Sequence, residues 1–234
     1  MSARAPQRLP ELGSDPTREY RLGIMGGTFD PIHYGHLVTA EQAREALDLD
    51  VVLFMPAGSP AFKESERVSG AEDRYAMTLL ATAANPDFVA SRLEIDREGI
   101  TYTVDTLRAL RSHYPDNVKL FFITGADAVL DIVSWRDASS IADLATLIAA
   151  TRPGYDINQA CERVEGSGIS FKVTYIEIPA LAVSSTNIRQ RVCEGKSIRY
   201  LTSESVIGYI RKNGLYRGAP TPDADPDRKG RALD

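Results

Sequence analysis

The chain has 234 residues, enough for one large domain or two small ones, and 43% of them are hydrophobic, which suffices for an ordinary core. A net charge of −5 argues against a nucleic-acid surface, and no run approaches the ~18 apolar residues that a membrane span requires. Cys161 and Cys193 provide neither a disulfide framework nor metal-ligand spacing. We therefore expect a cytoplasmic protein with no nucleic-acid or membrane partner and no metal site of its own.

Apolar runs and helical spacings alternate along the chain between two polar ends. Residues 1–19 and 218–234 are predicted to be flexible tails around one domain at 20–217. Strands are predicted at 20–25, 51–55, 88–93, 119–124, 144–150 and 172–178. Helices are predicted at 37–47, 71–84, 102–110, from 184 onward, and at 203–212. This order predicts an α/β fold: a Rossmann-like, doubly wound, mostly parallel sheet with a small helical C-terminal part.

The turn after the first strand combines two adjacent glycines, Gly26 and Gly27, with two histidines, His33 and His36. Glycines let the backbone approach a phosphate closely, and the start of the next helix offers free N–H groups to an anion. Histidines three residues apart stand side by side at such a helix start. The alternatives are a plain turn with surface histidines, or half of a metal site. The G-x-G-x-x-G fingerprint of dinucleotide sites is absent.

Two later segments favour the same kind of ligand. Residues 125–127, Gly-Ala-Asp, follow the fourth strand, and in a doubly wound sheet the loops after the first and fourth strands border one crevice. Residues 184–186 are two serines and a threonine, and they open a helix that carries Arg189. Hydroxyls, amides and a cation that face one way can cradle a triphosphate. An ordinary N-cap would explain only one of the three hydroxyls.

Two motifs carry a family resemblance. GGTFDPIHYGHL, at residues 26–37, resembles the signature of the HxGH nucleotidyltransferase superfamily, and VSSTNIR, at residues 183–189, is similar to its ISSTxxR motif. Within that superfamily, the chain most resembles the bacterial nicotinate-nucleotide adenylyltransferases, from about residue 22 to residue 217. The resemblance implies transfer of the adenylyl group of ATP to nicotinate mononucleotide, giving nicotinate adenine dinucleotide (deamido-NAD) and pyrophosphate in NAD biosynthesis. It also implies that Mg²⁺ accompanies ATP.

The patterns and the resemblance together assign roles to individual residues. The predicted catalytic residues are His33, His36, Lys63 and Arg189. The predicted ATP-binding residues are Gly26, Gly27, Thr28, Phe29, His33, His36, Gly125, Asp127, Ser184, Ser185, Thr186 and Arg189. The predicted acceptor-binding residues are Asp30, Arg74, Thr103, Asp105, Trp135 and Arg136. Among these, the resemblance places Trp135 against the pyridine ring and Thr103 beside it.

Several of these residues could have a structural role instead of the functional one. Lys63 is placed to reach a phosphate but can equally be a solvated lysine, and Phe62 departs from the histidine that the family often has there. Trp135 can be a packing plug over a helix end, and Asp105 a favourable charge at a helix start. The rival functions are the same transfer to another acceptor, such as phosphopantetheine or nicotinamide mononucleotide, and a nucleotide sensor without turnover. The oligomeric state stays open, a homo-oligomer included.

Overall fold

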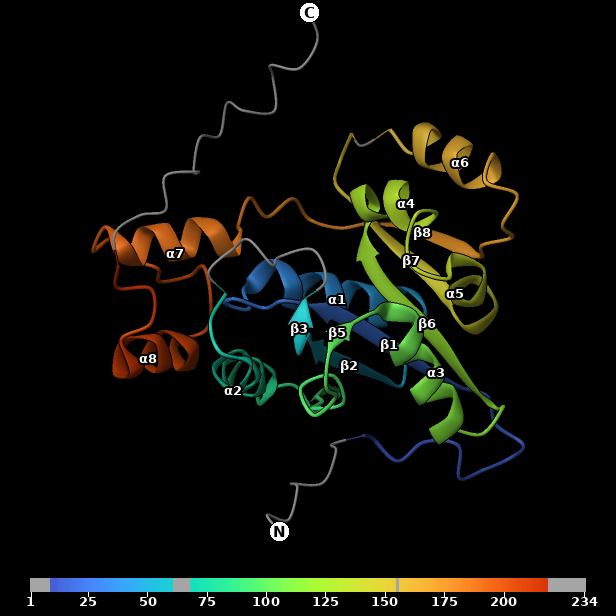
Figure 1. Cartoon of the computed structure of the whole chain (residues 1–234), viewed down its shortest axis with the longest axis horizontal. Helices are drawn as coiled ribbons and strands as arrows, with labels where there is room; N and C mark the ends of the chain where they lie inside the picture. Colours follow the sequence, from blue (N-terminus) through green and yellow to red (C-terminus); the bar gives the residue numbers. More distant parts are fainter. Residues whose placement is uncertain (1–8, 61–67, 155, 219–234) are drawn as a thin grey trace, which may run out of the picture.

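The computed structural model describes residues 9–60, 68–154 and 156–218 (Figure 1). Its central sheet has six parallel strands in the order β4-β2-β1-β6-β7-β8. From one edge to the other, the strands are β4 Phe88–Ala90, β2 Val51–Pro56, β1 Tyr20–Gly27, β6 Val118–Gly125, β7 Thr146–Thr151 and β8 Val173–Glu177. The order reverses between β1 and β6, where a ligand crevice is expected beyond the carboxyl ends of the strands. The predicted doubly wound, parallel fold is confirmed.

Helices cover both faces of the sheet. One face carries α3 Thr103–His113, α4 Ala126–Ile132, α5 Ala138–Leu144 and α6 Asn158–Glu165. The other carries α1 Tyr34–Ala46, α2 Ala71–Thr82, α7 Ser185–Cys193 and α8 Glu204–Asn213. Along β2, Leu53 and Met55 belong to the first core and Val52 and Phe54 to the second, because successive side chains of a strand point to opposite faces. Two covered faces explain why the predicted strands are continuous apolar runs.

The structure adds elements that the patterns did not predict. Helices α4, α5 and α6 have seven or eight residues each, too few to show a helical period over a window of about 11 to 18 residues. A second sheet pairs two strands of two residues each, β3 Ser59–Pro60 and β5 Ile100–Thr101. Strand β4 ends at Ala90, short of the predicted residue 93. The remaining strands and helices lie where they were predicted, with shifted ends.

Residues 9–19, predicted as part of a flexible tail, pack against the domain. Leu9 and Leu12 contact the core on the α3 face. The hydroxyl of Tyr114 donates a hydrogen bond to the carbonyl of Pro10 at 2.8 Å. Gly13 lies so close to Pro115 that a Cβ at this glycine would be 2.5 Å from the proline ring. In the described part of the chain, no helix is long and apolar enough to cross a membrane.

Candidate active site

The loop between β1 and α1 places two histidine rings face to face. The rings of His33 and His36 stack with their centroids 3.7 Å apart and their planes 21° from parallel. Phe29 supports the pair, because its buried ring meets His36 edge-on at 5.0 Å. Gly35 leaves room for the stack, since a Cβ there would lie 3.0 Å from two atoms of the His33 ring. A larger side chain at position 35 would therefore crowd the His33 ring.

Both imidazoles are neutral at pH 7. Burial lowers the pKa of His33 to about 4. Burial, together with the adjacent His33 ring, lowers the pKa of His36 well below its ordinary value. The Nδ1 atom of His36 accepts a hydrogen bond from the backbone N–H of His33 at 3.2 Å. The one proton of the His36 ring is therefore on Nε2, which makes His36 a hydrogen-bond donor to a ligand.

Asp30 and Arg74, both predicted to bind the acceptor, hold loops together beneath the site. The side chain of Arg74 is 1% exposed, and burial lowers its pKa. Its guanidinium donates to three backbone carbonyls: those of Thr28 at 2.9 Å, Gly58 at 3.0 Å and Ser69 at 3.0 Å. Asp30 is 3% exposed and accepts a hydrogen bond from the Tyr216 hydroxyl at 2.7 Å. These contacts hold the loop that follows Gly26 and Gly27 in place.

The start of α7 docks on the same turn. The Ser185 hydroxyl donates to the carbonyl of Pro31 at 2.8 Å. The guanidinium of Arg189 donates to the carbonyl of Asp30 at 2.8 Å, across 159 positions of sequence. Ser184 caps the helix, since its hydroxyl accepts a backbone N–H of the first turn at 3.2 Å. The two motifs that were separated in the sequence therefore form one contiguous structure.

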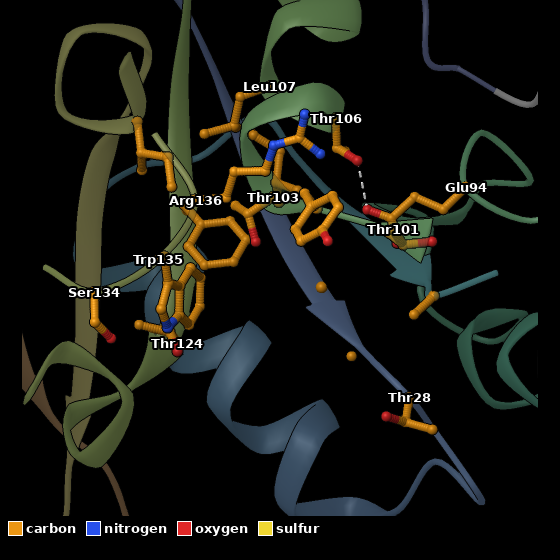
Figure 2. Close-up of a pocket in the computed structure, with 17 residues that line it drawn as sticks. Thr28, Glu94, Thr101, Thr103, Thr106, Leu107, Thr124, Ser134, Trp135 and Arg136 are labelled. Atoms are coloured by element: carbon orange, nitrogen blue, oxygen red, sulfur yellow. Dashed lines mark hydrogen bonds between the residues drawn. The ribbon is translucent and has the colours of Figure 1, made fainter. Parts of the chain in front are cut away.

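A first cavity, of about 550 Å³, opens where β1 and β6 end (Figure 2). Trp135 forms one wall, and Phe122 meets it edge-on at 6.1 Å. The guanidinium of Arg136 lies over the Tyr102 ring at 4.5 Å, next to Thr103. We call this cavity the aromatic pocket. Its other polar or glycine lining residues are Gly26, Gly27, Thr28, Glu94, Thr101, Thr106, Thr124 and Ser134.

A second cavity, of about 380 Å³, contains the histidine pair, and we call it the histidine pocket. His33, His36 and Thr39 line it from the β1–α1 side. Met25, Gly26 and Gly35 line it from the same side. The other lining residues come mainly from the ends of β6 and β7 and from the segment before α7: Ile123, Thr124, Gly125, Ala126, Asp127, Ala150, Arg152, Ile178, Pro179, Leu181 and Val183. Glycines, a carboxylate and an arginine among these suit a polar, charged ligand.

The two pockets meet at Gly26 and Thr124, which line both of them. Gly26 is the last residue but one of β1, and Thr124 the last but one of β6. A ligand in one pocket can therefore approach a ligand in the other at the point where the strand order reverses. The histidines lie on one side of this junction and Trp135 on the other.

The predicted residues do not all line a pocket. Gly125 and Asp127 lie in the histidine pocket, and Thr28, predicted with ATP, lies in the aromatic pocket. Asp105 lies on α3 with its carboxylate 3.9 Å from Arg108, outside both cavities. Lys63 and Phe62 lie outside the described residues. Other predicted residues support the loops around the pockets without lining either: Phe29, Asp30, Arg74, Ser184, Ser185, Thr186 and Arg189.

The lining residues that were not predicted include two charged ones, Glu94 and Arg152, and two with hydroxyl groups, Tyr102 and Thr106. Tyr102 and Thr106 fall inside residues 101–107, TYTVDTL, which resemble an (S/T)YTxDTL motif of the adenylyltransferase family, so their position in that segment was an available signal. Glu94 stands in a run of charged residues, where nothing in the sequence distinguishes a buried carboxyl from a solvated one.

Among the described residues, no group of three or more histidine, cysteine or acidic side chains could hold a metal ion. Asp127 is the only carboxylate among the residues that line the histidine pocket. The donor set therefore suits a metal ion that arrives with its own oxygen ligands better than one held in a protein cage.

The chain is similar to known proteins in sequence. A family described as cytidylyltransferase-like matches residues 24–191. A probable nicotinate-nucleotide adenylyltransferase from Moorella thermoacetica is 54% identical over 206 residues, covering 86% of this chain and 94% of the relative. One from Corynebacterium glutamicum is 47% identical and covers 91% of this chain and 95% of the relative.

Solved structures share the fold. Plasmodium falciparum nicotinic acid mononucleotide adenylyltransferase, complexed with APC, has a TM-score of 0.68 at 21% identity, covering 85% of this chain and 98% of that one. Its complex with NaAD has the same TM-score at 20% identity and the same coverage. The similarity extends over nearly the whole of that chain.

Proposed function

The chain belongs to the family of nicotinate-nucleotide adenylyltransferases, and we propose that its two pockets hold the two substrates of that reaction side by side. The enzyme transfers the adenylyl group of ATP to nicotinate mononucleotide, giving nicotinate adenine dinucleotide and pyrophosphate in NAD biosynthesis. The observation that carries the division of substrates is the junction of the pockets at Gly26 and Thr124. Two phosphates that react with each other must meet at such a point.

The aromatic pocket suits nicotinate mononucleotide. Trp135 offers a flat face to a pyridine ring, and Phe122 fixes its orientation. Thr103 begins α3, so its backbone N–H is one of the unpaired donors of a helix start and can bind the ring carboxylate. Arg136, at the same wall, adds a positive charge. Glycines 26 and 27 leave the strand end open to the acceptor phosphate.

The histidine pocket suits ATP. Gly125 ends β6 and Asp127 lies in the first turn of α4, so a backbone turn and a carboxylate there can hold a ribose. The α-phosphate lies near the junction, within reach of the Nε2–H of His36. The start of α7, with its hydroxyls and Arg189, lies beside the same loop and binds the β- and γ-phosphates. Lys63 keeps its proposed role as a further charge on the phosphate side.

The chemistry needs positioning more than proton transfer. A phosphate monoester is already anionic at neutral pH, so the 5′-phosphate of the mononucleotide attacks the α-phosphorus in line without a general base. His33 and His36 contribute as neutral donors that stabilise charge developing on the transferring group. Their low pKa values keep them in that state throughout the physiological pH range.

A divalent metal ion is typical of this family of nucleotidyltransferases. We propose that it is Mg²⁺ and that it enters as part of the MgATP substrate. The ion is then carried by triphosphate oxygens and water, which fits a histidine pocket with a single carboxylate.

The test is a coupled pyrophosphate assay of the full chain with ATP and three acceptors: nicotinate mononucleotide, nicotinamide mononucleotide and phosphopantetheine. We expect kcat/KM for the nicotinate form to exceed that for the nicotinamide form by about tenfold or more, because charge-assisted hydrogen bonds are roughly twice as strong as neutral ones. Turnover of phosphopantetheine at a comparable rate, or no pyrophosphate release with any mononucleotide, would refute the assignment.

A further inference from the structure

The aromatic pocket contains a carboxyl group with no part in the mechanism above. Glu94 is 5% exposed and is the only acidic residue among the described residues that line this cavity. In Figure 2 it lies on the wall opposite Trp135, so it faces the space that the pyridine ring would occupy. A carboxyl group is unexpected in a site for an anionic ring substituent, because two like charges there repel each other.

The surrounding contacts fix the carboxyl in place. The Thr106 hydroxyl on α3 donates to Glu94 Oε1 at 2.6 Å, shown as the dashed line in Figure 2. Arg97 in turn donates to Thr106 Oγ1 at 3.1 Å. Gly58 packs closely against the backbone of Glu94, since a Cβ at this glycine would be 2.2 Å from the Glu94 carbonyl oxygen. The side chain therefore has little freedom to move away from the pocket.

The positive charges near Glu94 are not sufficient to keep its carboxyl group ionised. Arg97 and the buried Arg74 attract a carboxylate there, but both are engaged with other oxygen atoms. Asp105 on α3 is turned to Arg108, and Arg136 lies over the Tyr102 ring. Burial therefore dominates and raises the pKa of Glu94 to about 7. The group changes its charge within the physiological pH range.

We propose that Glu94 determines how strongly the aromatic pocket prefers the acid over the amide form of the pyridine mononucleotide. The inference rests on the proposed function. The nicotinate ring carries a pyridinium charge and a carboxylate, whereas the nicotinamide ring carries the pyridinium charge alone. An ionised Glu94 attracts the cationic amide and repels the carboxylate of the acid. A neutral Glu94 accommodates the acid and can donate a hydrogen bond to it.

The measurement is the ratio of the two dissociation constants, for nicotinate and nicotinamide mononucleotide, determined by titration calorimetry between pH 6 and pH 8.5. The two ligands have the same phosphate, so its ionisation and that of distant residues cancel in the ratio. We expect the preference for the acid to weaken about tenfold as the pH rises. A repulsion of about 1.4 kcal/mol between two like charges in one site changes a dissociation constant by this factor.

Three variants separate charge from structure. Glu94→Gln keeps an oxygen that accepts from Thr106 but cannot ionise, so its ratio should be independent of pH. Thr106→Val removes a hydrogen bond that lowers the pKa of Glu94, so the preference for the acid should weaken at a higher pH than in the natural chain. Glu98→Gln alters an exposed carboxyl four residues away and should behave as the natural chain.

A constant ratio in the natural chain, or a pH-dependent ratio that persists in Glu94→Gln, would overturn the inference. Either result would leave the proposed function intact as long as the natural chain binds nicotinate mononucleotide. Failure to bind either mononucleotide would instead contradict the proposed function itself.

Discussion

Protonation of His33 should destabilise the folded chain as the pH falls. The pKa of this residue is about 4 in the folded chain, against an ordinary value of 6.5. Between these two pH values the unfolded chain binds more protons at this residue than the folded chain does. The contribution of neutral His33 to the free energy of unfolding is therefore complete above pH 6.5 and is lost as the pH falls toward 4. At about 1.4 kcal/mol per pH unit the total is about 3 kcal/mol, of which about 2 kcal/mol is lost by pH 5.

Urea unfolding at pH 7.5 and pH 5.0 measures this loss, with His33→Gln as the comparison, because glutamine stays neutral. We expect the natural chain to lose about 2 kcal/mol more than the variant. Glu94 has the opposite effect, since its pKa is raised to about 7 and the stability it contributes falls as the pH rises from 4.5 through 7. That contribution is present in both proteins and cancels. Equal losses in the two proteins would show that folding does not lower the pKa of His33, and would refute the reasoning.

Two further predictions concern the substrates. His36→Asn retains an acceptor near Nδ1 but removes the Nε2 donor, so kcat should fall about 100- to 1,000-fold while the unfolding curve changes little; a variant with more than half of the natural kcat would remove His36 from the transferring phosphate. Trp135→Ala should weaken mononucleotide binding by about 1–3 kcal/mol and leave ATP affinity unchanged. Calorimetry checks the second prediction, and an equal loss for both substrates would place Trp135 outside the acceptor site.

The sheet and its crevice could be predicted because each depends on local sequence. Apolar runs such as residues 51–55 identify buried strands, and the glycine turns after the first and fourth strands identify the point where the strand order reverses. The stacking of His33 on His36 follows from their spacing at a helix start.

Tertiary contacts could not be predicted in the same way. Arg74 was assigned to the acceptor because it matches a family position, yet its guanidinium is held by three carbonyls from separate loops. The hydrogen bond between Tyr216 and Asp30 joins positions 186 residues apart, which no local pattern reports. Glu94 is buried only because α3 and Gly58 close around it. Each of these depends on the assembled fold.

If the two pockets hold the two substrates, the adenylyl group passes directly from ATP in the histidine pocket to the mononucleotide in the aromatic pocket. The most direct test uses ATP with a single thiophosphate configuration at the α-phosphorus, together with nicotinate mononucleotide and Mg²⁺. We expect the thio-analogue of nicotinate adenine dinucleotide to form with inversion at phosphorus, because one in-line displacement occurs. Retention, which requires a covalent intermediate, or the absence of this product would rule out direct transfer between the two pockets.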